Sequence, residues 1–322
     1  MIIEGHGNLL TSSVEALVNT VNTQGVMGKG IALQFKRAFP AMFKDYAAAS
    51  KRGEVKLGEM HVWPTQTLDG PKFIINFPTK GHWRSPSRLT DIESGLEDLV
   101  RVVREEGITS IAVPPLGCGN GGLDWSEVEP RIRAAFESAP DVEVLLFAPV
   151  GAPAAVDMPV ATERPTMTTG RAALVGIIDR YIKQSFTEPS LIETQKLMYF
   201  LQNVGEPLNL KFVAHRYGPY ADNLRLVLSH VEGHFLTGFG DGSSKVRESE
   251  PLVPVAKAVS EADRVLADHP ETEKRISDVL DLASGFESAY DMELLATVHW
   301  VAVRAPEGVG DEDIAEKVAD WS

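Results

Sequence analysis

The sequence has a single cysteine, Cys118, among its 322 residues, so no internal disulfide can form. This fits a reducing compartment and predicts a cytoplasmic location. The eight histidines are scattered and no Cys/His group has zinc spacing, so we expect no metal site. The opening Met-Ile-Ile-Glu-Gly lacks the basic and apolar regions of a signal peptide. Apolar runs such as 142–150 are too short and interrupted to span a bilayer, so we expect no membrane association.

Excess charge is also scarce over most of the chain. The net charge is −14, but residues 1–150 contribute only −3 and residues 151–247 contribute +1. The other −12 lies in residues 248–322, which hold 18 acidic and 6 basic side chains. Such an acidic block repels nucleic acid and favours a basic partner surface. Solubility alone explains the block equally well.

The chain alternates between strand and helix patterns up to residue 150, which predicts helices packed around a mixed sheet. We expect strands at 1–4, 15–19, 60–64, 73–78, 110–114 and 142–148, and helices at 31–50, 88–106 and 125–138. A stretch rich in Pro, Ala, Thr and Gly, without hydrophobic period, then precedes a mainly helical region. We therefore place one domain at 1–155, a linker at 156–170 and a second domain at 171–322.

The first candidate loop is Gly25-Val-Met-Gly-Lys-Gly30, between a strand pattern and a helix pattern. Its three glycines let the backbone approach a ligand, and the free amides of the following helix suit a phosphate. Lys29 could also meet a phosphate. The loop matches neither the dinucleotide fingerprint nor the P-loop, so an ordinary turn remains the alternative. The carboxamide of Asn22 suits a ribose hydroxyl or, alternatively, an Asx turn.

The second candidate loop leaves the strand at 73–78 and places Lys80, His82, Trp83 and Arg84 within five residues. An aromatic ring beside basic groups suits a nucleobase and phosphates. A partly desolvated lysine at a strand end can act as a nucleophile toward a sugar aldehyde equivalent. A solvated basic loop is the alternative interpretation.

The third candidate loop, Gly117–Gly122, holds four glycines in six residues directly after a buried strand pattern. This arrangement is typical of a phosphate cradle. Cys118 lies in it, but the sequence places no histidine beside the thiol. We therefore interpret Cys118 as a small buried residue and not as a nucleophile.

Together, Asn19–Ala32 and Val113–Trp125 resemble the two ligand loops of macrodomains, as does the opening Gly7-Asn8-Leu9-Leu10. The Phe77–Arg84 segment is similar to the branch whose catalytic group is a lysine, the DarG antitoxin family. Lys196–Phe200 and Tyr217–Tyr220 resemble a helical, Panacea-like antitoxin domain. The resemblance implies a three-layer α/β/α macrodomain followed by a mainly α-helical toxin-binding domain.

The resemblance further implies hydrolysis of ADP-ribose from thymidine bases in single-stranded DNA, a repair reaction that releases ADP-ribose and needs no cofactor. It implies that Lys80 is catalytic and that residues 171–322 bind and neutralise the companion DarT toxin, with the block at 248–322 imitating DNA charge. Asn8 falls where many macrodomains read adenine with an aspartate, and Asn22 matches the distal-ribose asparagine. The substrate-binding residues implied are Asn8, Leu9, Asn22, Met27, Gly28, Lys29, Gly30, Ile31, His82, Trp83, Gly117, Cys118, Gly119, Asn120, Gly121, Gly122 and Leu123.

One departure from the pattern bears on the mechanism. A related lysine-dependent hydrolase has an aspartate in the third loop, where this sequence has Gly121, and Asp124 lies nearby but out of register. Assistance to Lys80 by a carboxylate therefore stays open. Two other functions also stay open: an ADP-ribose reader without hydrolysis, and removal of ADP-ribose from protein carboxylates.

Overall fold

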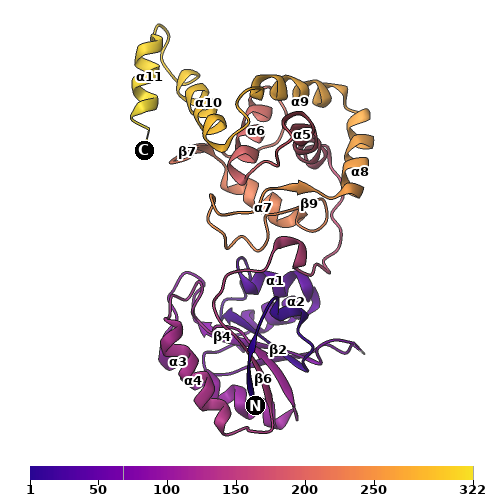
Figure 1. Ribbon diagram of the computed structural model, residues 1–322, viewed down its shortest axis with the longest axis vertical. Helices are drawn as coiled ribbons and strands as arrows, with labels where there is room; N and C mark the ends of the chain where they lie inside the picture. The colour runs from indigo at the N-terminus through magenta and orange to yellow at the C-terminus, as the bar shows by residue number, and fades with distance from the viewer. Residues whose placement is uncertain (68, 322) are drawn as a thin grey trace. The chain divides into compact units, whose positions relative to one another are not determined.

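The structure is a computed structural model that describes residues 1–67 and 69–321 (Figure 1). The chain divides into two compact units, Met1–Glu163 and Arg164–Ser322, which we call the N-terminal and C-terminal units. The division falls within the segment interpreted above as a linker. No helix of the described residues is long and apolar enough to cross a membrane.

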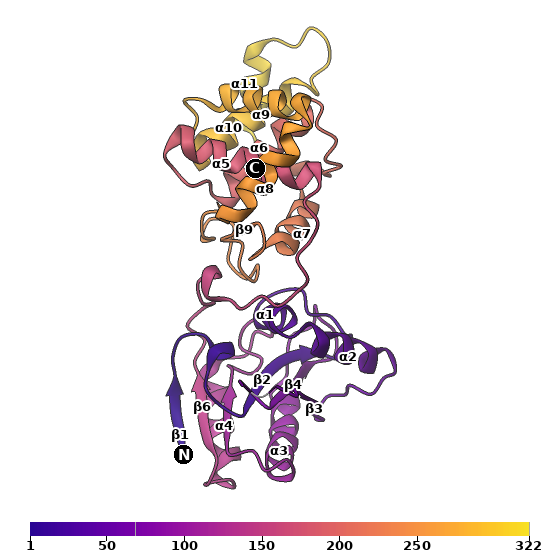
Figure 2. The same cartoon turned by 90° about the vertical axis from the view of Figure 1, so that its right-hand side faces the viewer.

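A six-stranded sheet in the order β1-β6-β5-β2-β4-β3 forms the centre of the N-terminal unit. Neighbouring strands are parallel except β3, which runs antiparallel to β4 at one edge. Figure 2 shows β1 beside β6 at the other edge. The strands are β1 (Ile2–Gly5), β2 (Ala16–Asn22), β3 (His61–Pro64), β4 (Phe73–Lys80), β5 (Ser110–Val113) and β6 (Glu143–Phe147).

Helices cover both faces of this sheet because successive strand residues point to opposite sides. On one face, Met42 and Tyr46 pack with Leu17 and Ile74 of the sheet. On the other, a separate core joins helix residues such as Leu96 to strand residues such as Val18. The covering helices are α1 (Ile31–Ala38) and α2 (Pro40–Lys51) on the first face, and α3 (Leu89–Glu105) and α4 (Trp125–Glu137) on the second. The predicted three-layer sandwich is confirmed.

The single helix predicted for 31–50 is wrong, because α1 ends at Ala38 and α2 begins at Pro40. Between them Phe39 has φ −131° and ψ 68°, outside the helical region. The ring of a proline disfavours helical backbone at the preceding residue, while the proline itself suits the first position of a new helix. Pro40 is the sequence signal that marks this break.

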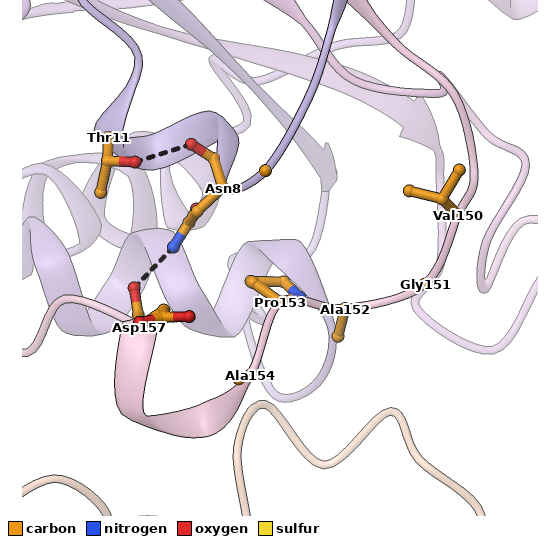
Figure 3. Close-up of a pocket in the computed structure, with 9 residues that line it drawn as sticks. Asn8, Thr11, Val150, Gly151, Ala152, Pro153, Ala154 and Asp157 are labelled. Carbon is orange, nitrogen blue, oxygen red and sulfur yellow. Dashed lines mark hydrogen bonds between the residues drawn. The ribbon is translucent and has the colours of Figure 1, made fainter.

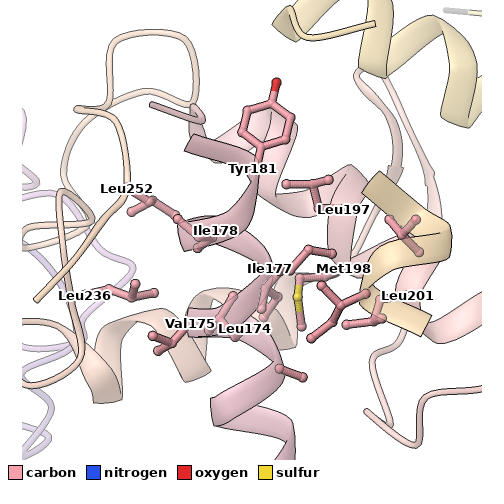
Figure 4. Close-up of a cluster of buried hydrophobic side chains, with 14 of the residues drawn as sticks. Leu174, Val175, Ile177, Ile178, Tyr181, Leu197, Met198, Leu201, Leu236 and Leu252 are labelled. Atoms are coloured by element: carbon pink, nitrogen blue, oxygen red, sulfur yellow. The ribbon is translucent and has the colours of Figure 1, made fainter. Parts of the chain in front are cut away.

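The C-terminal unit is mainly helical, as expected. Figure 4 shows its core, in which Ile177 and Ile178 of α5 lie with Leu197 and Met198 of α6. Its helices are α5 (Thr169–Ser185), α6 (Leu191–Asn203), α7 (Asp222–Val231), α8 (Ala256–Ala267), α9 (Pro270–Ala283), α10 (Ala289–Ala302) and α11 (Asp311–Ala319). Two short hairpins pair β7 (Val213–His215) with β8 (Gly218–Tyr220), and β9 (Leu236–Thr237) with β10 (Val253–Pro254).

A buried lysine fixes the first of these hairpins. Lys196 of α6 is fully buried, and its Nζ donates to the carbonyl oxygens of Tyr217 and, at 2.8 Å, Pro219. Burial lowers the pKa of this amine to about 7, against an opposing effect of Glu293. The two segments that resembled an antitoxin domain therefore pack together. The Lys196 amine supplies hydrogen bonds to two carbonyl oxygens of the hairpin.

Candidate active site

The three candidate loops leave neighbouring strands β2, β4 and β5 at their carboxyl ends, so the fold brings them together. Thr23 joins the first loop to the second: its N–H donates to Lys80 O at 3.2 Å and its Oγ1 to Gly81 O at 2.7 Å. Lys80 joins the second loop to the third, because its Nζ donates to Asn120 O at 2.7 Å. The loops therefore form one site, in which Lys80 is central.

Close approach of the first and third loops explains one of the glycines. Gly30 has φ +65°, and a Cβ there would lie 3.2 Å from Nδ2 of Asn120. Gly30 is also the N-cap of α1 and has no side chain with which to cap that helix end. The first amides of α1 are thus available to an anionic ligand.

The third loop has no room for a side chain at Gly121. A Cβ there would overlap both the carbonyl oxygen of Gly117 and Oγ of Ser87. Ser87 N–H holds the same turn by donating to Gly121 O at 2.9 Å. The loop in this conformation has no room for an aspartate at position 121, and this position contributes backbone and not a carboxylate.

Asn22 adopts the Asx turn that was the alternative interpretation of this residue. Its Oδ1 accepts from Gln24 N–H at 2.9 Å, and its Nδ2 donates to Val26 O at 2.6 Å. The hydroxyl of Tyr46, on α2, donates to the backbone oxygen of Asn22. The carboxamide thus shapes the first loop, and its contact with a ribose stays a prediction.

Lys80 is half-buried, and burial lowers the pKa of its amine below the ordinary value. Within residues 1–67 and 69–321, no carboxylate forms an ion pair with it. A partly desolvated amine without a counter-ion spends more time uncharged, which is the nucleophilic form. The surroundings of Lys80 favour nucleophilic chemistry.

Aromatic and basic side chains stack beside Lys80. Trp83 is exposed, with the ring of His82 stacked 5.5 Å away and the Arg84 guanidinium 4.3 Å from the indole centroid. Arg84 N–H donates to Nδ1 of His82 at 3.1 Å, which holds the turn. Such a stack offers exposed aromatic surface and positive charge to a nucleic-acid strand.

Two polar groups of the third loop are unsuited to catalysis. The thiol of Cys118 has its pKa raised to about 11 by burial and by Asp124, so it stays protonated. Asp124 caps α4, accepting from Ser126 N–H at 2.8 Å and Ser126 Oγ at 2.7 Å. These bonds lower the pKa of the Asp124 carboxyl and occupy one of its oxygens. Lys80 is therefore the strongest candidate catalytic group of the three loops.

Asn8 lies in a pocket of about 490 Å³ (Figure 3). Its Oδ1 accepts from Leu10 N–H at 2.9 Å and its Nδ2 donates to Asp157 O at 2.8 Å. Asn8 thereby caps a short 3₁₀ helix, Leu9–Thr11, and ties it to a second one, Ala155–Asp157. Gly7, Thr11, Val150, Gly151, Ala152, Pro153, Ala154 and Asp157 complete the pocket lining.

The lining after β6 was missed from the sequence. Residues 150–157 have no hydrophobic period and carry several Pro, Gly and Ala, so no ligand contact was predicted there. Residues 150–155 were placed at the end of the first domain, and Asp157 in the linker. The hydrogen bond from Asn8 to Asp157 joins residues 149 positions apart, and no local sequence pattern predicts such a contact.

The remaining predicted residues differ in what they offer a ligand. The side chains of Leu9 and Met27 are buried in the core, so only their backbone can face a ligand. Ile31, Cys118 and Leu123 are half-buried, and Gly117 is buried. Exposed positions are Gly28, Lys29, Gly119, Asn120 and Gly122. This pattern is that of a loop site built mainly from backbone groups.

The layered sheet with its ligand loops defines the N-terminal unit as a macrodomain, and the Macro domain family matches residues 18–132. A DNA ADP-ribosyl glycohydrolase of Mycobacterium tuberculosis is 47% identical over 315 residues, which cover 94% of this chain and 89% of that protein. A DNA ADP-ribosyl glycohydrolase of Thermus aquaticus is 47% identical, covering 98% of this chain and 86% of the relative.

Among solved structures, the macrodomain of Mycobacterium tuberculosis DarG is 62% identical and covers 46% of this chain and 98% of that chain, with a TM-score of 0.46. The full-length similarities show that this chain belongs to the DarG family of DNA ADP-ribosyl glycohydrolases. It is a macrodomain hydrolase of the class that removes ADP-ribose from DNA. The predicted family is confirmed.

Proposed function

We propose that the N-terminal unit removes ADP-ribose from thymidine bases of single-stranded DNA, with Lys80 as the nucleophile. The bond from Lys80 Nζ to Asn120 O, 2.7 Å long, is the observation on which this rests. It holds the amine across the glycine loops, where the distal ribose would follow a diphosphate bound by their amides. The lowered pKa of Lys80 supports the same assignment.

In the proposed reaction, the neutral amine of Lys80 attacks C1 of the distal ribose or its opened form. The bond from C1 to the base nitrogen breaks, and the base leaves with the bonding electrons and the proton that the amine loses. Water then displaces the amine, which releases ADP-ribose and restores Lys80. The covalent intermediate divides one difficult substitution into two easier steps.

The proposed contacts of the substrate follow the three loops. Gly28–Ile31 and Gly117–Leu123 would hold the diphosphate through backbone amides, while Asn22 would contact the distal ribose. The exposed stack of His82, Trp83 and Arg84 would take the flanking DNA strand. The pocket at Asn8 would hold the adenosine end of the ligand.

The test compares turnover of a thymidine-ADP-ribosylated oligonucleotide by wild type, Lys80→Ala and Lys80→Arg. Both variants should lose at least about 10³-fold in turnover, because arginine keeps the charge but cannot act as a nucleophile. Lys44→Ala, which removes an exposed lysine of α2, is the matched control. Normal turnover by Lys80→Ala would falsify the lysine mechanism.

The same measurement separates the alternatives. Wild type that binds ADP-ribose but turns over no modified DNA is a reader. Wild type that acts on ADP-ribosylated protein carboxylates and not on DNA has the other specificity.

We further propose that the C-terminal unit binds and neutralises the cognate DarT toxin, which makes the chain an antitoxin acting in the cytoplasm. The acidic block at 248–322 supports this, because a toxin that modifies DNA needs a basic DNA-binding surface. Charged contacts of this kind speed association and weaken in salt.

Charge reversal tests how far the acidic residues contribute to toxin binding. Glu316→Lys together with Asp320→Lys, both exposed in the C-terminal unit, should slow toxin association about tenfold. Glu97→Lys on the N-terminal unit is the control. An affinity that is unaffected by these changes and by salt would exclude imitation of DNA charge.

A further inference from the structure

An apolar stripe lies open on the C-terminal unit. It consists of Leu282, Phe286, Tyr290, Leu294 and Val298, spaced four residues apart and between 39% and 72% exposed. Tyr290, Leu294 and Val298 lie on α10, where residues four apart share one face of a helix. The same spacing in sequence adds Leu282 at the end of α9 and Phe286 in the loop after it.

The stripe is separate from the packed face of α10. Met292 and Ala296 of the same helix are fully buried in the core of the unit. The helix therefore carries apolar side chains both where it is packed and where it is open. Several large apolar side chains left exposed along one face of a helix are suited to a partner.

The charge around the stripe limits what that partner can be. Asp281, Glu287, Asp291 and Glu293 lie within or beside it in sequence, and residues 276–303 contain no lysine or arginine. Of the basic residues just before this segment, Lys274 pairs with Asp278 and Arg275 with Glu206. Arg304, just after it, lies over the Trp300 ring. In a second copy of this chain the same carboxylates would face one another across a symmetric interface. The surface instead complements a protein that borders an apolar patch with lysine and arginine.

We propose that this stripe is the anchoring surface for such a protein, which under the proposed function is the toxin. The inference rests on that function and adds that the apolar and acidic side chains have different roles in binding. The apolar side chains hold the partner after contact, whereas the acidic residues orient it during approach. The aromatic ring of Tyr290, the most exposed member, is the central anchor.

The test measures association and dissociation rates of the purified toxin on the full-length chain carrying Tyr290→Ser, alone and with Leu294→Ser. We expect the dissociation rate to rise at least tenfold with little change in the association rate, and the defect to persist at high salt. Leu226→Ser on α7 is the matched control, because Leu226 and Tyr290 are both 72% exposed. Melting curves confirm that each variant is folded.

The possible outcomes distinguish a failure of the stripe as anchor from a failure of the proposed toxin binding. Wild type that does not bind the toxin contradicts the proposed toxin binding. Wild type that binds, with Tyr290→Ser and the double variant binding equally well, overturns the stripe alone. Self-association of wild type that the Tyr290→Ser change abolishes, seen by sedimentation, would identify a second copy as the occupant and also overturn it.

Discussion

Each unit of this protein desolvates a lysine, and the two lysines serve opposite purposes. Lys80 is half-buried at a strand end, where its amine bonds a single carbonyl oxygen and remains reachable. Lys196 is sealed in the core, where its amine bonds two carbonyl oxygens of a hairpin. Burial lowers the pKa of both amines. Reactivity therefore depends on access, which a lowered pKa alone does not indicate.

The two units also differ in the kind of binding surface that each presents. The N-terminal unit offers backbone amides in glycine loops, which suit a small anionic ligand. The C-terminal unit offers side chains, in the apolar stripe and its carboxylates, which suit a protein. If the two surfaces are separate, four changes should affect the two units differently.

The largest effect is expected at Gly121. A Cβ there overlaps Gly117 O, so Gly121→Ala should distort the third loop and lower turnover at least about a hundredfold. At Gly119 a Cβ meets nothing within 4 Å, so Gly119→Ala should lose far less. Turnover of modified DNA and toxin binding are measured together. Loss of toxin binding in Gly121→Ala would contradict the separation of the two surfaces.

The next effect is on folding of the C-terminal unit. Lys196→Met removes the donor to one buried and one partly buried carbonyl oxygen and should lower the free energy of unfolding by about 2–4 kcal/mol. Chemical denaturation of wild type and variant gives this difference. Removal of ADP-ribose from DNA by the variant should persist under conditions where both units are folded. A variant as stable as wild type would mean that the hairpin does not depend on the amine.

The pH dependence of stability follows from the same lysine. The pKa of Lys196 falls from 10.5 when unfolded to about 7 when folded, so between these values the unfolded chain binds the extra proton. Stability of the C-terminal unit should therefore rise as the pH increases from 7 toward 10.5. Lys196→Met should remove this rise. Melting temperatures across that range measure the effect, and a slope unchanged by Lys196→Met would contradict it.

The pH dependence of turnover tests the other lysine. If only the neutral amine of Lys80 reacts, single-turnover rates should rise up to tenfold per pH unit until its lowered pKa is passed. A profile that is flat from weakly acidic to alkaline pH would exclude deprotonation of Lys80 as a requirement. Lys44→Ala should follow the wild-type profile.

Local chemistry made much of the fold and of the loops predictable. Strand and helix patterns predicted the layered sheet, and the glycines of Gly25–Gly30 and Gly117–Gly122 marked loops that do meet at one edge. The break at Pro40 had a local signal that the single-helix interpretation overlooked. These features depend on neighbours in the sequence.

What the sequence did not reveal depends on distant partners. The bond from Asn8 to Asp157 joins opposite ends of the N-terminal unit, so nothing near either residue predicts it. The stripe from Leu282 to Val298 has the spacing of a buried helix face, and only the structure separates it from the packed face at Met292. Hydrophobic periodicity in a sequence predicts which residues share one face of a helix, but it does not predict what packs against that face.

The bond between Asn8 and Asp157 also has a consequence for synthesis on the ribosome. The sheet needs β6 to hold its first strand, β1, and the pocket closes only when Asp157 has emerged. Both partners precede α5, the first helix of the C-terminal unit, so they leave the ribosome before that helix does. Because domains generally fold as units during synthesis, the hydrolase can complete its fold while the rest of the chain is still being made. A nascent chain therefore has its macrodomain ready before its C-terminal unit.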